Sequence, residues 1–375
     1  MDTRVFIAAC NEYKDADAAV GRVLAQFGGA AAILNGRKRV LVKPNLVLPR
    51  KPETATTSHP AVVGAVCRAF IEAGAEVSVI DSSGMPHSVP ALRTLYSLCG
   101  MEQMAKETGA ALSYDTNSRK VTYPEGKTLQ EFTILSPVLD AELVITVGKA
   151  KTHLAAQMTG CVKNLFGCVP GLGKPALHRQ FPGREEFYST LLDLVTCINP
   201  GFAVLDGVWG MEGGGPTGGD PKFLGVVAGG YNAHAVDLAQ CHLMCLRAEQ
   251  IFSLKEAAKR GLIPEDPAVL TWLGDAVEPV RFKPAAAAAE TRLPFLLRHM
   301  ARYLLPKSTV QKIYQRLAAG PEISARCIGC GDCKQVCPAQ CIAIAEGRAA
   351  IDGGKCIKCY CCHEFCPAKA IDIQK

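Results

Sequence analysis

The sequence predicts an α/β protein, with a mostly parallel sheet covered by helices on both faces, followed by a small α+β module at the C-terminus. Two observations predict this. Short apolar runs alternate with amphipathic helical stretches through residues 1–280, which is typical of strands joined by crossover helices. The end of the chain instead carries one cysteine pattern twice, which indicates a separate module.

The predicted strands are short apolar runs that end in polar residues. They are "RVLVKP" (39–44), "EVSVID" (76–81), "ELVITV" (142–147), "FAVLD" (202–206) and "FLGVVAGG" (223–230). The predicted helices are residues 59–75, 90–109, about 156–168, 185–198 and 233–246. The first of these helices has a proline near its start and a glycine near its end, the usual positions of these two residues.

Composition favours a cytoplasmic protein that binds metal. Of the 375 residues, 49% are hydrophobic and 20% charged, as in soluble globular proteins. No apolar run is long enough to cross a bilayer, and the N-terminal apolar stretch is too short for a signal peptide. In a reducing compartment, 18 cysteines indicate metal binding and not disulfides. The net charge of +6 and the absence of a dense basic block give no sign of a nucleic-acid partner.

Polar residues follow the predicted strands, where ligands of open α/β sheets bind. Lys43 and Asn45 follow the first strand, and Lys149, Lys151 and His153 follow the third. Asp81 and Asp206 each end a strand. Taken singly, each lysine is more often a solvated residue. Together they predict a shared pocket for a small anion, which could also stabilise an enolate-like charge during reaction.

The stretch "DGVWGMEGGGPTGGDP" (206–221) is rich in glycine. It formally contains G-x-G-x-x-G, but Pro216 interrupts it and it leads to a strand instead of a helix, so it is no dinucleotide fingerprint. No P-loop is present, and no NAD or flavin motif is recognisable. We expect Gly213 and Gly214 to let the backbone approach a ligand, with Glu212 as an acid, base or ligand. The alternative is a flexible surface loop.

The C-terminal motifs "CIGCGDCKQVCP" and "CIKCYCCHEFCP" both read C-x2-C-x2-C-x3-C-P, the pattern that holds 4Fe–4S clusters in bacterial ferredoxins. Paired cysteines also bind zinc, but eight cysteines in two identical runs favour two clusters. Over residues 321–375 the chain resembles the two-cluster bacterial ferredoxin domain, in which the motifs exchange their fourth ligands. The resemblance implies the sets Cys327, Cys330, Cys333, Cys366 (cluster 1) and Cys356, Cys359, Cys362, Cys337 (cluster 2). Cys341 and Cys361 fall outside both.

Residues 323–375 carry seven Lys and Arg against five Asp and Glu. This mildly basic balance suits an acidic electron donor such as ferredoxin or flavodoxin. A predicted basic amphipathic helical connector, residues 284–320, joins the module to an α/β domain of residues 1–283. The connector either packs on a neighbouring domain or lies on a membrane surface.

Several motifs of the α/β part resemble the family called domain of unknown function 362. They are "VLVKPNLV", "TTSHPAVV", "GKAKTH", "CVKNLFG", "DGVWGMEGGGPTGG" and "NAHAVDLA". The family has no agreed reaction, and "MEGGGP" departs from it where Asn often lies between the glycines. The resemblance implies catalytic roles for Lys149, Lys151, His153 and Glu212. It implies substrate-binding roles for Lys43, Asn45, Lys163, Asn164 and Asp206, to which the glycine-rich stretch adds Gly213 and Gly214.

These observations favour an iron–sulfur oxidoreductase that passes low-potential electrons to a small anionic substrate, for example to reduce a conjugated double bond. One alternative is a ferredoxin-like electron-transfer or metal-handling partner protein. The other is a non-redox lyase or isomerase with structural clusters. The sequence names neither the substrate nor the oligomeric state.

Overall fold

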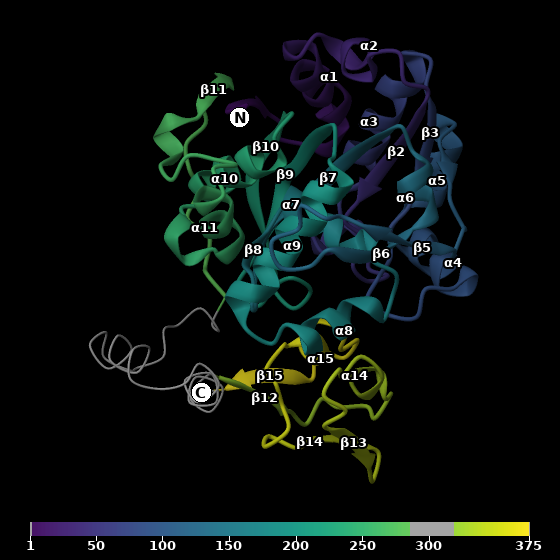
Figure 1. The fold of residues 1–375 in the computed structure, drawn as a ribbon, viewed down its shortest axis with the longest axis vertical. Coiled ribbons are helices and arrows are strands. Elements are labelled where there is room, and N and C mark those ends of the chain that lie inside the picture. The colour runs from purple at the N-terminus through teal and green to yellow at the C-terminus, as the bar shows by residue number, and fades with distance from the viewer. Residues whose placement is uncertain (1, 286–318, 375) are drawn as a thin grey trace.

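In the computed structural model, which describes residues 2–285 and 319–374, an α/β domain is followed by a small C-terminal module that lies against one end of it (Figure 1). The domain is built on a nine-stranded sheet in the order β11-β1-β10-β9-β7-β2-β3-β4, with β8 paired to β7. Its strands are β1 (Arg4–Ala9), β2 (Arg39–Pro44), β3 (Glu76–Val79), β4 (Ala111–Leu112), β7 (Leu143–His153), β8 (Gln157–Thr159), β9 (Phe202–Glu212), β10 (Asp220–Gly230) and β11 (Thr271–Gly274).

Most pairs in this sheet are parallel. The pairs β1–β11, β2–β3, β2–β7, β3–β4 and β7–β9 are parallel. The pairs β1–β10, β9–β10 and β7–β8 are antiparallel. A separate hairpin joins β5 (Ser118–Thr122) to β6 (Glu131–Leu135). The predicted fold class is therefore confirmed.

Helices cover both faces of the sheet because successive strand residues point to opposite sides. In β2, Val40 and Val42 belong to one apolar core while Leu41 belongs to the other. The first core is covered by α1 (Ala16–Gln26), α2 (Gly29–Leu34), α3 (Pro60–Glu72), α4 (Val89–Leu98) and α5 (Met101–Thr108). The second is covered by α6 (Ser136–Asp140), α7 (Cys161–Asn164), α9 (Arg184–Ile198), α10 (Ala233–Leu243) and α11 (Phe252–Lys259).

Four predicted elements differ from those observed. The helix expected over 90–109 divides into α4 and α5 at Gly100, whose φ of 75° ends a right-handed helix. The helix expected near 156–168 is instead β8, the short α7 and a 3-10 turn at Leu165–Cys168. Strands β7 and β9 run to His153 and Glu212, well beyond the predicted ends. The cause is that β9 continues into a long hairpin with β10, and β7 stays paired beside it.

The C-terminal module contains two copies of one helix–strand unit. The short helix α14 (Asp332–Gln335) is followed by β13 (Ile342–Ala345), and α15 (Cys361–Glu364) is followed by β15 (Ile371–Gln374). Strand β13 forms a hairpin with β14 (Arg348–Ile351), and β15 pairs with β12 (Gly320–Ile323). Its core is made of cysteines, isoleucines and alanines.

The predicted connector falls almost entirely on residues 286–318, outside the described part of the chain, so its structure and the domain limits stay predictions. Within the described residues, no helix has the length and apolar character needed to cross a membrane.

Candidate functional site

A cavity lies between the α/β domain and the C-terminal module. The domain contributes lysine, asparagine, aspartate and histidine side chains, and α15 contributes the opposite wall. Its polar lining includes Asn45, Asp81, Lys151, Lys163, Asn164, Lys174, His178 and Glu364, together with Cys361 and Phe365. Figure 1 shows α8 (Gly173–Gln180) and α15 at this junction, and residues of both line the cavity. Two segments far apart in sequence thus share one cavity.

The module is held in place by apolar packing and a few hydrogen bonds. Leu48 of the domain packs with Val336, Cys361 and Phe365 of the module. The Thr217 hydroxyl donates to the Glu364 carbonyl at 2.8 Å. Gly214 O lies 3.3 Å from a ring nitrogen of His363. The glycine-rich segment that the sequence assigned to a ligand therefore contacts the module.

Phe365 fits against Gly84 because that position has no side chain. A Cβ at residue 84 would lie 2.1 Å from Phe365 Cζ, far inside contact distance. We expect Gly84→Val to expel the ring, at a cost of about 1–3 kcal/mol, and to release the module. Small-angle scattering should then show a larger radius of gyration. Gly21→Val is the matched control, because a Cβ there meets nothing within 4 Å. Identical scattering from wild type and Gly84→Val would contradict this docking.

Lys43 does not line the cavity but contacts two residues that do. It is fully buried, and its ammonium lies 2.7 Å from Asp81 Oδ1. It also donates to Asn164 Oδ1 at 3.0 Å and to the Pro44 carbonyl at 2.8 Å. Lys43 thus holds two cavity residues, Asp81 through an ion pair and Asn164 through a hydrogen bond. A Cβ at Gly167 would lie 2.2 Å from Asp81 Oδ1. The Lys43–Asp81 ion pair therefore leaves no room for a side chain at position 167.

Lys149 and Asp206 form a second buried ion pair, away from the cavity lining. Lys149 donates to Asp206 Oδ2 and to the Tyr13 hydroxyl, both at 2.8 Å. Burial lowers the pKa of Lys149, and the charge of Asp206 opposes that shift. The His59 ring stacks on Tyr13 with 3.5 Å between centroids. The pairing register explains the separation from Lys151, because Lys149 pairs with Asp206 while Lys151, after an irregularity, pairs with Met211.

Lys151 and Lys163 are the two predicted lysines that line the cavity. Lys151 is fully buried and donates to Asn45 Oδ1 at 2.6 Å and to the Thr56 carbonyl at 2.7 Å. Burial, followed by the charges of Lys163 and Lys149, holds the pKa of Lys151 well below its usual value. For Lys163, the described residues offer no hydrogen bond or ion pair, only the ring of Phe166, whose centroid is 5.9 Å from Nζ.

His153 bridges the domain and the module without lining the cavity. Its Nδ1 accepts from the backbone amides of Ala155 and Ala156 at 3.1 and 3.2 Å, so the ring proton is on Nε2. Nε2 is 3.2 Å from Glu364 Oε1 but is not aligned for a hydrogen bond and has no such partner in the described structure. Burial lowers the pKa of His153 well below its usual value, which keeps the ring neutral.

The remaining predicted residues of the glycine-rich segment lie outside the cavity lining. Glu212 Oε2 accepts from the backbone amide of Lys283 at 2.8 Å. The Gly213 carbonyl accepts from the Thr152 hydroxyl at 3.0 Å, and Gly214 faces the module as described. Pro216 is the member of this segment that lines the cavity.

Sequence reasoning missed three charged or titratable residues of the cavity. Burial lowers the pKa of Lys174 to about 7 and that of His178 to about 3. Both lie on α8, which follows no strand, so no strand-end rule could find them. Glu364 lies inside the second cysteine motif, where only the docking of the module could show its role.

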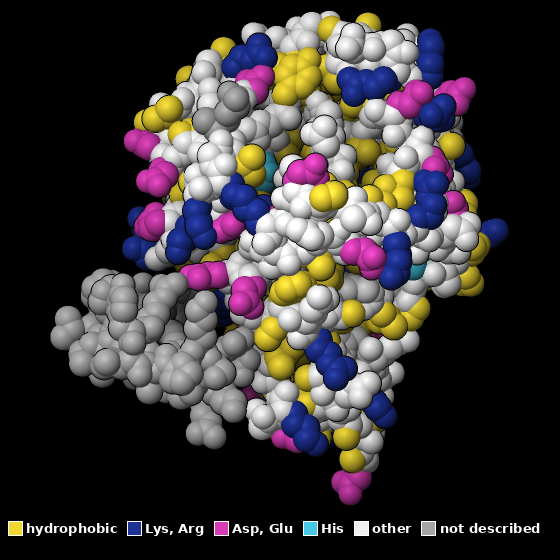
Figure 2. Space-filling model, viewed as in Figure 1, with side chains coloured by type: hydrophobic (Ala, Val, Ile, Leu, Met, Phe, Trp, Pro, Cys, Tyr) yellow, Lys and Arg dark blue, Asp and Glu magenta, His cyan; other side chains and the backbone are white. Residues whose placement is uncertain are grey.

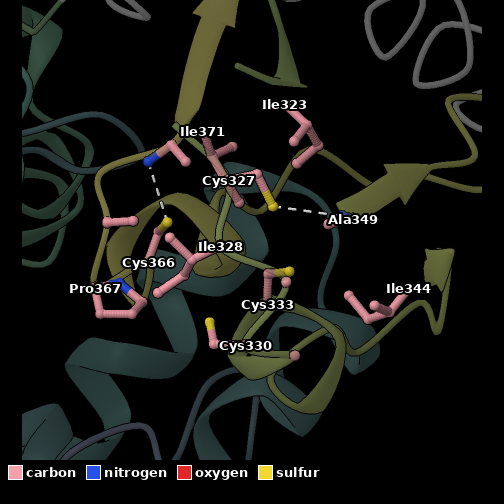
Figure 3. A pocket seen from close by; sticks show the side chains of 14 residues that line it. Ile323, Cys327, Ile328, Cys330, Cys333, Ile344, Ala349, Cys366, Pro367 and Ile371 are labelled. Atoms are coloured by element: carbon pink, nitrogen blue, oxygen red, sulfur yellow. Dashed lines mark hydrogen bonds between the residues drawn. The ribbon is translucent and has the colours of Figure 1, made fainter. Parts of the chain in front are cut away.

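Four cysteines from both motifs line one cavity within the module. They are Cys327, Cys330, Cys333 and Cys366, and Figure 3 shows their sulfur atoms turned toward a shared space. Backbone amides of Ala349 and Ala370 donate to the sulfurs of Cys327 and Cys366 at 3.4 and 3.2 Å. Such N–H···S bonds stabilise thiolates that hold iron. These residues thus fit the set that the sequence assigns to cluster 1.

The second set is divided between two apolar clusters. Cys337, Cys356 and Cys362 belong to the module core, whereas Cys359 packs toward Leu48 and Phe365 at the cavity wall. Cys341 lies beside them, with its sulfur 3.5 Å from that of Cys337. Among the described residues, no three His, Cys, Asp or Glu gather closely enough to hold a single metal ion.

Together these features define a class: an α/β protein whose lysine-lined cavity is closed by a cysteine-rich module. Residues 40–242 match the family model for domain of unknown function DUF362, so the chain belongs to this family. It is 28% identical over 249 residues to the thylakoid-associated protein sll1697 of Synechocystis sp., covering 66% of this chain and 75% of that protein.

A solved structure, the lactate racemase apoprotein from Thermoanaerobacterium thermosaccharolyticum, is similar at 14% sequence identity with a TM-score of 0.40. The similarity covers 64% of this chain and 58% of that chain.

Proposed function

We propose that the protein is a cytoplasmic iron–sulfur oxidoreductase that reduces a small anionic molecule in the cavity between its two parts. The observation that carries the proposal is the composition of that cavity. One wall carries Lys151 and Lys163, which have no carboxylate partner among the described residues, and the other carries Cys361 and Phe365. Phe365 packs with Cys359, a predicted iron ligand of cluster 2. A small molecule held by the lysines would therefore lie beside the second cysteine set.

Two 4Fe–4S clusters, bound by the cysteine sets given above, would supply single electrons at low potential. The protein's own residues would bind and orient the substrate. Lys163 would contact its anionic group, and Asn45 and Asn164, each fixed by a lysine, would shape the binding surface. Phe365 and Pro216 would exclude water, which strengthens the attraction between charges.

The module offers an exposed face to an electron donor. Ile328 is 68% exposed and lies between Cys327 and Cys330, itself exposed. Lys334 and Lys369 are exposed and close in sequence to Cys333 and Cys366. Figure 2 shows Lys and Arg side chains over this part of the molecule. We propose an acidic donor such as ferredoxin or flavodoxin, because opposite charges accelerate encounter.

The test is reoxidation of the reduced protein. Protein purified without oxygen is reduced, and its absorbance is followed as a protein-free extract of small molecules is added. Lys163→Met should raise the extract concentration needed for half-maximal rate on the order of 10–100-fold, because a hydrogen bond to a charged group contributes about 1.5–3 kcal/mol.

The exposed Lys106 provides the control, since Lys106→Met should match wild type. Equal reoxidation of wild type and Lys163→Met would contradict an anion site in the cavity. Reoxidation by added ferredoxin or flavodoxin and not by the extract would instead support the electron-carrier alternative.

A further inference from the structure

We infer that Lys151 is an amine nucleophile, and that the ligand of the cavity is an anionic carbonyl compound that forms an imine with it. This inference rests on the proposed function in one respect only, namely that the cavity binds a small anion. It adds the chemical class of the ligand and the atom that reacts with it.

Hydrogen bonding distinguishes Lys151 from Lys43 and Lys149, the other two fully buried lysines of the described residues. Lys174 of the same cavity also donates to two neutral acceptors, the Ser83 and Val169 carbonyls, so the test below compares the two lysines. An ammonium has three donors, whereas a neutral amine has two donors and a lone pair. Lys43 has three acceptors including the Asp81 carboxylate, as an ammonium requires. Lys149 also has a carboxylate partner, Asp206. Lys151 has two neutral acceptors, Asn45 Oδ1 and the Thr56 carbonyl, and no third in the described structure. Its contacts therefore match a neutral amine.

The surroundings of Lys151 also favour the neutral form. It is fully buried, and the nearby charges of Lys163 and Lys149 add to the cost of a further positive charge. Glu364 and Asp81 act in the opposite direction, but Asp81 is already paired with Lys43. Lysines of lowered pKa in apolar sites are good nucleophiles toward carbonyl groups.

The charge of the ligand follows from Lys163, which lines the same cavity without a partner in the described structure. A carboxylate or phosphate on the ligand would satisfy it. The expected ligand thus carries an anionic group and an aldehyde or ketone, as oxo acids do.

Imine formation requires only the Lys151 amine and the carbonyl compound. The Lys151 nitrogen adds to the carbonyl carbon, the oxygen takes up protons and leaves as water, and a C=N bond forms. The protonated imine withdraws electrons from a neighbouring C=C bond, which makes a conjugated ligand easier to reduce. Water then hydrolyses the imine and restores the amine.

The test is reductive trapping with glyoxylate, the smallest aldehyde that carries a carboxylate. The full-length protein is treated with glyoxylate and cyanoborohydride at pH 7 without oxygen, and modified lysines are located by peptide mass spectrometry. We expect Lys151 to be labelled at least about tenfold faster than any exposed lysine, because at pH 7 fewer than about one in a thousand exposed lysines is neutral.

Two variants and a second aldehyde make the result specific. Lys151→Arg, which keeps a long side chain with N–H donors but cannot form an imine, should lose the fast label. Lys163→Met should slow labelling by glyoxylate on the order of tenfold more than labelling by uncharged acetaldehyde, because loss of this charge raises the pKa of Lys151 for both aldehydes but removes an anion partner only for glyoxylate. Labelling mainly at Lys174 or at exposed lysines would overturn the inference. Reoxidation that still depends on Lys163 would then leave the proposed function standing.

Discussion

Replacing Cys366 with alanine should lower the iron content from about eight to about four atoms per chain, because Cys366 of the second motif completes the cluster of the first. The structure supports this crossed arrangement, since Cys366 lines a cavity with Cys327, Cys330 and Cys333. Iron and sulfide analysis after anaerobic reconstitution measures the loss.

Double variants separate crossed ligation from ligation within each motif. Cys330→Ala combined with Cys366→Ala should lose no more iron than either single change, since both remove the same cluster. Cys330→Ala combined with Cys337→Ala should lose nearly all iron, although both residues belong to the first motif. The reverse pattern would show that each motif holds its own cluster.

Cys341→Ala and Cys361→Ala are the matched controls. The sequence places neither residue in a ligand set, and both should retain about eight irons. Cys341 is the demanding control, because its sulfur lies 3.5 Å from that of Cys337. Loss of iron in Cys341→Ala with none in Cys337→Ala would show that Cys341, and not Cys337, is the fourth ligand of cluster 2.

Lys43→Met should lower the free energy of unfolding by about 3–5 kcal/mol, because it leaves the buried Asp81 carboxylate without its partner. Denaturant unfolding can be followed by tryptophan fluorescence, and both tryptophans, Trp209 and Trp272, lie in the α/β domain. The transition therefore reports on the part of the molecule that contains the pair.

Lys163→Met should change stability by less than about 0.5 kcal/mol, since no ion pair is lost. Asp81→Asn in the Lys43→Met background should recover part of the loss, because a neutral amide needs no charged partner. Equal destabilisation by Lys43→Met and Lys163→Met would show that the two lysines do not have the different roles described above.

Several features of the structure could be predicted from local sequence patterns. The short apolar runs within residues 39–44 and 76–81 predicted β2 and β3, because strands of a sheet covered on both faces are apolar nearly throughout. The resemblance of the two cysteine motifs to those of two-cluster ferredoxins, which exchange their fourth ligands, predicted which four cysteines share a cavity in the module.

The pairing of charged side chains far apart in the sequence could not be predicted. Lys43, Lys149 and Lys151 all looked like pocket lysines, since each lies at or near the predicted end of a strand. Two of them are bound to carboxylates 38 and 57 residues away. The register between β7 and β9 decides which lysine meets Asp206, and no local pattern encodes that register.

The sequence by itself determined the alternating α/β architecture, the family and the two cysteine motifs, because each depends on residues close together in the chain. Only the tertiary structure decided which lysines are free to bind a ligand and that Lys174, His178 and Glu364 join them. The reason is physical: a charge is available for binding only when folding leaves it without a partner, and that depends on the docking of segments far apart in sequence.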